Sequence, residues 1–120
     1  MYKSYYYDQS SRRIGRVSDL IRKEISDLLL KEVKDPRIGM VSLTGVKLTK
    51  DLKIARVFFS VIGEEETIKN SAIGLNRAAG FIKKRLGRII KLRNIPDIIF
   101  EYDNSLEYGE RINKILNELK

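Results

Sequence analysis

Apolar residues recur every three or four positions in three stretches of the chain, the spacing that places side chains on one face of a helix. The first stretch begins with Ile14 and ends near Val33. It follows two serines that can cap a helix and stops before Asp35-Pro36, because a residue that precedes proline disfavours the helical region. The second stretch covers residues 67–93, and the third begins at Ser105. The pattern therefore predicts a long first helix, a central helical region and an extra C-terminal helix.

Three other stretches are rich in β-branched and aromatic residues and are predicted to be strands, namely 40–49, 54–62 and 97–103. In the first of them the alternation of apolar residues reverses its phase at Thr44-Gly45, where a β-bulge would return all of them to one face. Residues 50–53 provide a short turn, so the first two strands are expected to pair as a hairpin. Three strands packed against helices predict an α+β domain of two layers.

The central helical region carries an unusual concentration of positive charge. The whole chain has 24 Lys and Arg against 16 Asp and Glu, which gives a net charge of +8. Residues 67–96 contain no acidic residue, and their basic residues account for the whole of that excess. Such a concentrated patch is typical of a protein that binds a polyanion. The basic residues of this window are Lys69, Arg77, Lys83, Lys84, Arg85, Arg88, Lys91 and Arg93.

Near the centre of the window the step Ala78-Ala79-Gly80 predicts a break or kink that divides the region into two helices. Glycine disfavours a helix by roughly 1 kcal/mol relative to alanine and adopts backbone angles that a Cβ forbids. In the second half, the basic side chains at 84, 85, 88 and 91 fall on the arc opposite the apolar positions 82, 86 and 90. An ordinary solvated face is the alternative interpretation of this arc, but such faces usually mix both signs of charge.

We predict that this arc binds RNA, with the contacts made by Arg77, Lys83, Lys84, Arg85, Arg88, Lys91 and Arg93. Phe81 lies within the arc and either stacks on a base or is buried against the sheet. A second, weaker candidate for RNA contact is the basic start of the first helix, formed by Arg12, Arg13 and Arg16. Acidic residues lie near that face, so an ordinary solvated surface is an equal alternative there.

The chain lacks the residues on which several classes of function depend. The chain has neither cysteine nor histidine, so it has no thiolate nucleophile, no zinc-thiolate site and no histidine base. No apolar run is long enough to span a bilayer. We therefore expect a cytoplasmic protein that is not an enzyme, with no catalytic residue, cofactor, metal or small-molecule substrate. We also expect a single domain over residues 11–120, after a flexible tyrosine-rich terminus at residues 1–10.

The predicted order of elements resembles the type II KH fold, an RNA-binding or single-strand-binding module. The Gly-x-x-Gly loop that clamps phosphates between the central helices of that fold is missing, and Ala78-Ala79-Gly80 stands in its place. An Ala-x-Gly step at this position is similar to that of bacterial ribosome-binding factor A, in which an interrupted helix replaces the loop. Further segments that resemble this family are Arg16-Val17, Val-Lys-Asp-Pro-Arg at 33–37, Asp-Leu-Lys-Ile-Ala-Arg-Val at 51–57, Leu-Arg-Asn-Ile-Pro at 92–96 and Asp-Asn-Ser at 103–105.

The resemblance implies a function that the residues alone do not give. Members of that family bind the immature small (30S) ribosomal subunit and its 16S rRNA, support rRNA processing and maturation, leave before translation and matter most in the cold. A cytoplasmic monomer that works without a membrane is expected on this basis. Two other nucleic-acid binders remain as alternatives, a permanent ribosomal protein and a DNA-binding helix-turn-helix built from residues 67–93.

Overall fold

The computed structural model describes residues 12–105 and Glu118. The tyrosine-rich terminus predicted at 1–10 and the helix predicted beyond Ser105 lie outside these residues. The elements, in order, are α2 (Arg12–Lys31), β1 (Val41–Leu48), β2 (Ile54–Val61), α3 (Glu65–Ile89) and β3 (Asp97–Tyr102).

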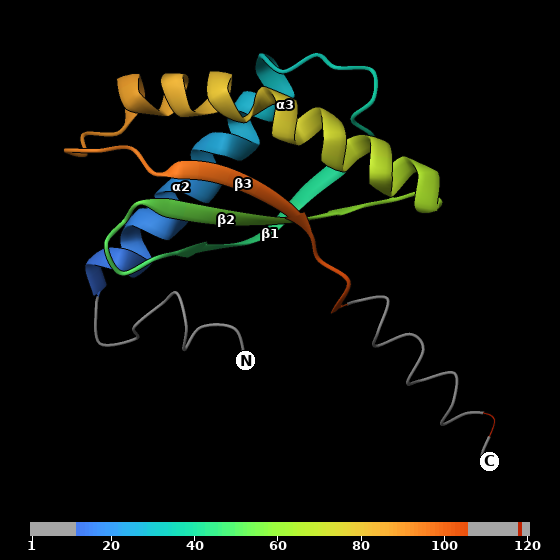
Figure 1. Ribbon diagram of the computed structural model, residues 1–120, viewed down its shortest axis with the longest axis horizontal. Helices are drawn as coiled ribbons and strands as arrows, with labels where there is room; N and C mark the ends of the chain where they lie inside the picture. The colour runs from blue at the N-terminus through green and yellow to red at the C-terminus, as the bar shows by residue number, and fades with distance from the viewer. Residues whose placement is uncertain (1–11, 106–117, 119–120) are drawn as a thin grey trace.

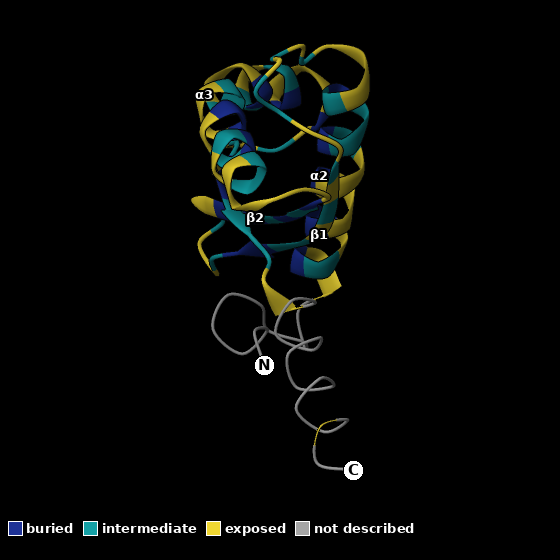
Figure 2. Cartoon of the chain, turned by 90° about the vertical axis from the view of Figure 1, so that its right-hand side faces the viewer, coloured by how far each residue is buried: buried dark blue, intermediate teal, exposed yellow. Residues whose placement is uncertain are grey.

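The three strands form one sheet in the order β1-β2-β3. Strand β1 is antiparallel to β2, and β3 is parallel to β2 because α3 carries the chain back along the sheet. Both helices lie on the same face of the sheet, α2 over β1 and α3 over β3 (Figures 1 and 2). The predicted α+β class, with a three-stranded sheet packed against helices in KH-like order, is confirmed.

The bulge predicted in β1 is present. The register of β1 on β2 shifts between Leu43 and Gly45, so that Thr44 is the extra residue. Beyond the shift, Val46 lies opposite Val57, and Leu48 lies opposite Ala55. The bulge thus brings the second half of β1 into phase with β2, and Leu48 is completely buried beneath the helices.

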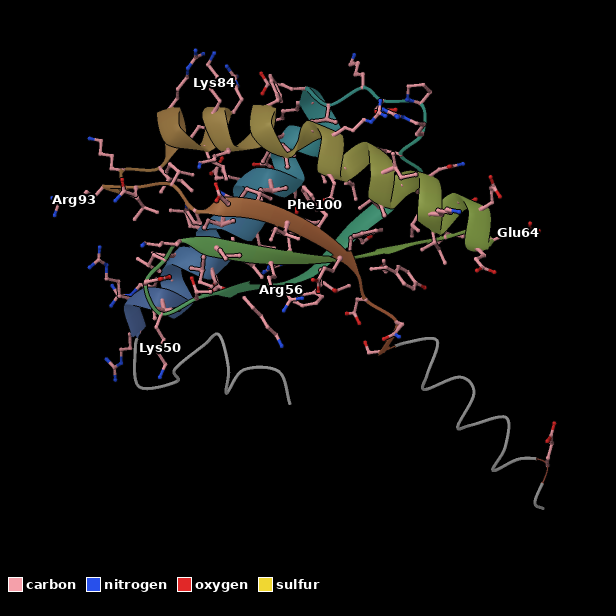
Figure 3. The ribbon with its side chains drawn as sticks, in the orientation of Figure 1. Lys50, Arg56, Glu64, Lys84, Arg93 and Phe100 are labelled. Carbon is pink, nitrogen blue, oxygen red and sulfur yellow. The ribbon has the colours of Figure 1, made fainter. Side chains whose placement is uncertain are left out.

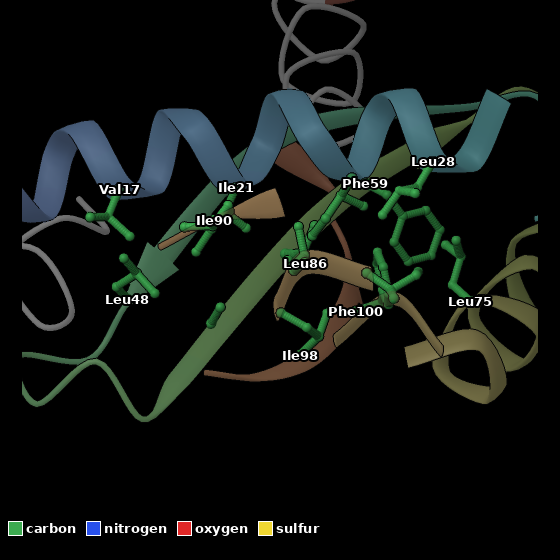
Figure 4. Packing of buried hydrophobic residues seen from close by; sticks show 14 of the residues in the cluster. Val17, Ile21, Leu28, Leu48, Phe59, Leu75, Leu86, Ile90, Ile98 and Phe100 are labelled. Carbon is green, nitrogen blue, oxygen red and sulfur yellow. The ribbon is translucent and has the colours of Figure 1, made fainter. Parts of the chain in front are cut away.

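The core lies between the sheet and the two helices (Figure 4). The apolar stripe predicted for the first helix is buried in α2, and α3 contributes the residues of its inner face. Burial of each large aliphatic side chain stabilises the fold by about 1.5–3 kcal/mol. The largest side chains with almost no exposure are Ile21, Ile25, Leu48, Val57, Phe59, Leu75, Ile82 and Leu86.

The loop between α2 and β1 fixes the first half of α3. The Gly39 amide donates a hydrogen bond to Ser71 Oγ at 3.0 Å, and Ser71 is buried on α3. One turn further along α3, a Cβ at Gly74 would stand 2.7 Å from Ile38 Cγ1. A glycine at 74 is therefore what lets the loop pack closely on the helix.

In the same loop, the Asp35 carboxylate accepts hydrogen bonds from the Arg37 side chain, with Nε to Oδ1 at 3.0 Å, and from the Arg37 backbone amide at 2.9 Å. These bonds lower the pKa of Asp35 to about 2 from an ordinary value of 3.8. The unfolded chain takes up this proton first as the pH falls, so the stabilisation is complete above about pH 4 and is lost as the pH falls towards 2. We expect Asp35→Asn to flatten the decline of the unfolding free energy between pH 4 and 2. Urea titrations at several pH values measure it, and an unchanged slope would contradict the assignment.

Helix α3 also protects the free edge of β3. The Asn76 side chain donates a hydrogen bond from Nδ2 to the Phe100 carbonyl at 3.1 Å and accepts one at Oδ1 from the Phe100 amide at 3.0 Å. Phe100 is in the middle of β3, and these two backbone groups point away from β2. The amide of Asn76 therefore satisfies them as a neighbouring strand would.

Candidate nucleic-acid interface

Helix α3 carries most of the predicted RNA-binding residues, and it is one helix of 25 residues. The prediction of two helices separated at Gly80 is therefore wrong. A single glycine weakens a helix by only about 1 kcal/mol, whereas the buried residues on both sides of it, Leu75 and Ile82, belong to one apolar stripe that packs on the sheet. The axis of α3 nevertheless changes direction near its middle (Figure 1). That Ala78-Ala79-Gly80 causes this bend stays a prediction.

Five of the seven predicted contact residues are exposed. Arg77, Lys84 and Arg88 lie on α3, and Lys91 and Arg93 follow it in the loop that leads to β3. Among the described residues, none of the five has an ion-pair partner. Figure 3 shows Lys84 pointing away from the sheet and Arg93 at one end of the molecule, with Glu64 at the opposite end of α3.

The other two predicted contacts are held by carboxylates of the same chain. Lys83 Nζ is 2.6 Å from Asp97 Oδ1 at the start of β3. Arg85 forms a two-pronged pair with Glu32 beyond the end of α2, with Nε to Oε2 at 3.0 Å and Nη2 to Oε1 at 2.5 Å. Partly exposed pairs of this kind contribute roughly 0–1 kcal/mol each. Lys83 and Arg85 therefore orient α3 on its neighbours, and their charges are less available to a polyanion than those of Lys84 and Arg88.

The exposed side of α3 has no side chain at two glycines, Gly80 and Gly87, which lie two turns apart on the same face of the helix. Together with the loop before β3 they line a hollow of about 470 Å³ whose cations are Lys83, Lys84 and Arg93. A Cβ at Gly80 would meet no described atom within 4 Å beyond its own helical backbone. The ring of Phe81, next to this glycine, is 46% exposed, so burial against the sheet does not describe it. The arrangement leaves the backbone of α3 accessible between cations, which allows a phosphate chain to approach it closely.

The second candidate cluster lies at the start of α2, where Arg12, Arg13 and Arg16 are all exposed. The structure brings one of them, Arg13, beside the β1–β2 turn and the loop before β3 in a second hollow of about 580 Å³. The basic residues of that turn, Lys50 and Lys53, were not predicted as contacts. The sequence shows the turn with a lysine at each end. Only the pairing of β2 with β3 shows that this turn lies beside the loop before β3.

Other kinds of site find little support in the described part of the chain. No group of acidic side chains in residues 12–105 could hold a metal ion. No helix there has the length and apolar character needed to cross a bilayer.

Comparison with known proteins decides the family. Residues 13–116 match the sequence model of one family, described as ribosome-binding factor A. The chain belongs to the ribosome-binding factor A family. The relative from Trichlorobacter lovleyi is 49% identical over 108 residues, which cover 90% of this chain and 88% of the relative. The relative from Brevibacillus brevis is 45% identical over 107 residues, with 89% and 88% covered.

Solved structures of the family share the fold. A Thermotoga maritima protein provisionally assigned to ribosome-binding factor A superimposes with a TM-score of 0.70 at 30% identity, over 78% of this chain and 90% of its own. The crystal structure of ribosome-binding factor A from Thermus thermophilus gives a TM-score of 0.69 at 20% identity, over 77% and 97%. A homology model of the Thermus thermophilus factor has been fitted into a cryo-EM map of a 30S complex, and it matches with a TM-score of 0.57 at 22% identity, over 78% and 94%.

Proposed function

We propose that this chain is a ribosome assembly factor that binds the immature 30S subunit through its 16S rRNA and supports rRNA processing and maturation. It acts as a cytoplasmic monomer and carries out no catalysis of its own. The exposed side of α3 and the loop after it form the RNA-binding surface, with Arg77, Lys84, Arg88, Lys91 and Arg93 as its principal cations. Lys83 and Arg85 contribute from the flanks, where their carboxylate partners already hold them.

One observation carries the proposal. The basic residues that make up the whole net charge of the chain lie in a stretch without acidic residues, and α3 turns most of them away from the core. The family membership supports the ribosome as the partner, because relatives at 45–49% identity are named for ribosome binding. RNA duplexes are bound through their shape and phosphates, so we expect little sequence preference.

The alternatives differ in how they fit the structure. A helix-turn-helix needs two helices joined by a turn within residues 67–93, and α3 is one uninterrupted helix as far as Ile89. A permanent ribosomal protein differs from an assembly factor in where it is found. A tagged copy of this chain should sediment with free small subunits and be absent from translating ribosomes. Its presence in translating ribosomes would favour the permanent protein.

Binding should depend steeply on salt. If about four of the exposed cations neutralise phosphates, the affinity for purified immature small subunits should fall by roughly three decades for each tenfold rise in KCl. The measurement is a binding titration at several KCl concentrations, with Mg²⁺ held constant so that the subunit keeps its structure. An affinity independent of KCl would mean that phosphates are not the groups recognised by α3.

Substitution of the exposed glycine separates stability from binding. Gly80→Ala places a methyl group where the structure has open space, and alanine favours an exposed helix by about 1 kcal/mol, so thermal stability should rise. If an RNA backbone passes over Gly80, the same methyl group should lower the affinity for the subunit about five- to tenfold. Gly45→Ala is the control, since a Cβ there also meets no atom within 4 Å but lies in β1. Higher stability with unchanged affinity would show that the RNA does not approach Gly80.

A further inference from the structure

The two basic hollows are neighbours that share one wall. The hollow on α3 and the hollow at the β1–β2 turn are both lined by Lys83, Arg93, Asn94 and Ile95. The shared wall is the loop that connects α3 to β3, and it is anchored next to the turn because the Asp97 amide donates a hydrogen bond to the Lys53 carbonyl at 2.8 Å. The cations therefore form a continuous row from Lys84 past Arg93 to Lys53.

The turn presents its lysines on a well-ordered frame. Thr49 Oγ1 donates a hydrogen bond to Asp51 Oδ1 at 2.6 Å and accepts bonds from the backbone amides of Lys53 and Ile54 at 3.2 and 3.1 Å. Leu52 adopts a φ of 60°, a conformation uncommon for a residue with a Cβ. Such a backbone persists only where the surrounding bonds hold it, so the backbone that carries Lys50 and Lys53 is ordered before any partner arrives.

The carboxylates of the second hollow do not cancel its positive charge. It is lined by the cations Arg13, Lys53, Lys83 and Arg93 and by two carboxylates. Asp97 is paired with Lys83, and Asp51 accepts bonds from Thr49 and from the Lys53 amide within the turn. Among the described residues no carboxylate pairs with the side chain of Arg13, Lys53 or Arg93, and Lys50, which precedes Asp51 in the turn, is exposed.

We infer that the RNA-binding surface continues from α3, past the loop before β3, to the β1–β2 turn. Its second half is the cluster of Arg13, Lys50, Lys53 and Arg93. This inference rests on the proposed function and adds to it the kind of RNA recognised. Lys84 points outward above α3, whereas Lys50 lies at the end of the molecule on the level of the sheet (Figure 3). A straight duplex laid along α3 would leave the turn without a contact. The surface therefore fits an RNA whose phosphate backbone bends, as at a junction of two helices or where a single strand leaves a helix.

Directed cleavage tests this directly, because the chain has no cysteine and a single introduced thiol can be labelled alone. An iron chelate that generates hydroxyl radicals is attached to Lys50→Cys, to Ile89→Cys, which is half-exposed as the last residue of α3 and follows Arg88, or to Lys69→Cys near the acidic start of α3. Each labelled protein is bound to immature small subunits and the rRNA cleavage sites are mapped. We expect strong cleavage from positions 50 and 89, on two rRNA elements that are not coaxial, and little from position 69.

A charge variant gives a second readout. Lys50→Gln with Lys53→Gln should lower the affinity for immature subunits roughly tenfold and reduce the logarithmic salt dependence by about 1.5, since two phosphate contacts are lost. Cleavage from position 89 alone, with an unchanged affinity of the double variant, would overturn the second half of the surface and leave the proposed function standing. Cleavage by both probes within one straight helix would overturn the bend. If neither probe cleaves rRNA while the labelled protein stays bound to the subunit, the assignment of the RNA-binding surface to α3 and this inference both fail, whereas subunit binding itself stands.

Discussion

Reversal of three charges on the exposed side of α3, by Lys84→Glu, Arg88→Glu and Lys91→Glu together, is expected to abolish binding to the immature small subunit. Each substitution removes a phosphate contact and puts a carboxylate in its place, so both the lost attraction and the new repulsion act against the complex. At moderate salt the affinity should fall roughly a thousandfold or more. Co-sedimentation with purified immature subunits measures the effect.

The fold should survive this change. All three side chains are exposed, and none has an ion-pair partner among the described residues. Arg88 lies in the last turn of α3, where a cation favours the helix dipole, and its reversal should destabilise the protein by only about 0.3–1 kcal/mol. The matched control reverses Lys31, Lys34 and Lys69, three exposed lysines that are not part of the proposed surface, so the net charge changes by the same amount. Full binding by the folded triple variant of α3 would remove the proposal.

Leu86→Ala should have the largest effect on stability of any change close to the basic surface. Leu86 is completely buried on the inner side of α3, beneath Lys84 and Arg88. Truncation of a buried leucine to alanine removes its transfer free energy and leaves a cavity, at about 2–5 kcal/mol. This is a large share of the roughly 5–15 kcal/mol that stabilises a domain, and the melting temperature should fall by about 10 °C or more. Urea and thermal unfolding measure the loss.

The neighbouring turn of the same helix provides the control. Ile89→Ala changes an aliphatic residue that is 46% exposed, and it should alter the unfolding free energy by less than about 1 kcal/mol. Binding separates the two roles further. Leu86→Ala should bind subunits nearly normally well below its melting temperature and lose binding as it unfolds. An equal, small destabilisation by both variants would mean that α3 does not rest on the sheet as described.

The sequence predicted the elements but not the continuity of α3. Periodicity placed both described helices, all three strands and the bulge at Thr44, because these features follow from which face of each element must be buried. The break at Gly80 was inferred from a local preference of about 1 kcal/mol, which the packing of the whole stripe on the sheet exceeds. Tertiary contacts can override a local preference of that size.

The site was predicted only in part, for a similar reason. The absence of acidic residues in 67–96 located the charge, but the carboxylates that pair with it come from elsewhere in the chain. Glu32 is 53 positions from Arg85, and Asp97, which pairs with Lys83, is the first residue beyond the window. The pairing of β2 with β3 places the β1–β2 turn beside the loop before β3. Contacts between distant segments depend on topology, and no spacing within one segment indicates them.

The pairing of Asn76 with Phe100 bears on how the protein behaves in concentrated solution. An edge strand with unpaired backbone groups can pair with a strand of another chain and start edge-to-edge aggregation. Asn76 occupies the middle of β3 at that edge, so a foreign strand would first have to displace two hydrogen bonds. Within the described residues, β1 is the other outer strand of the sheet, and it is interrupted by a bulge. Neither border of the sheet therefore offers a long, regular template for an incoming chain.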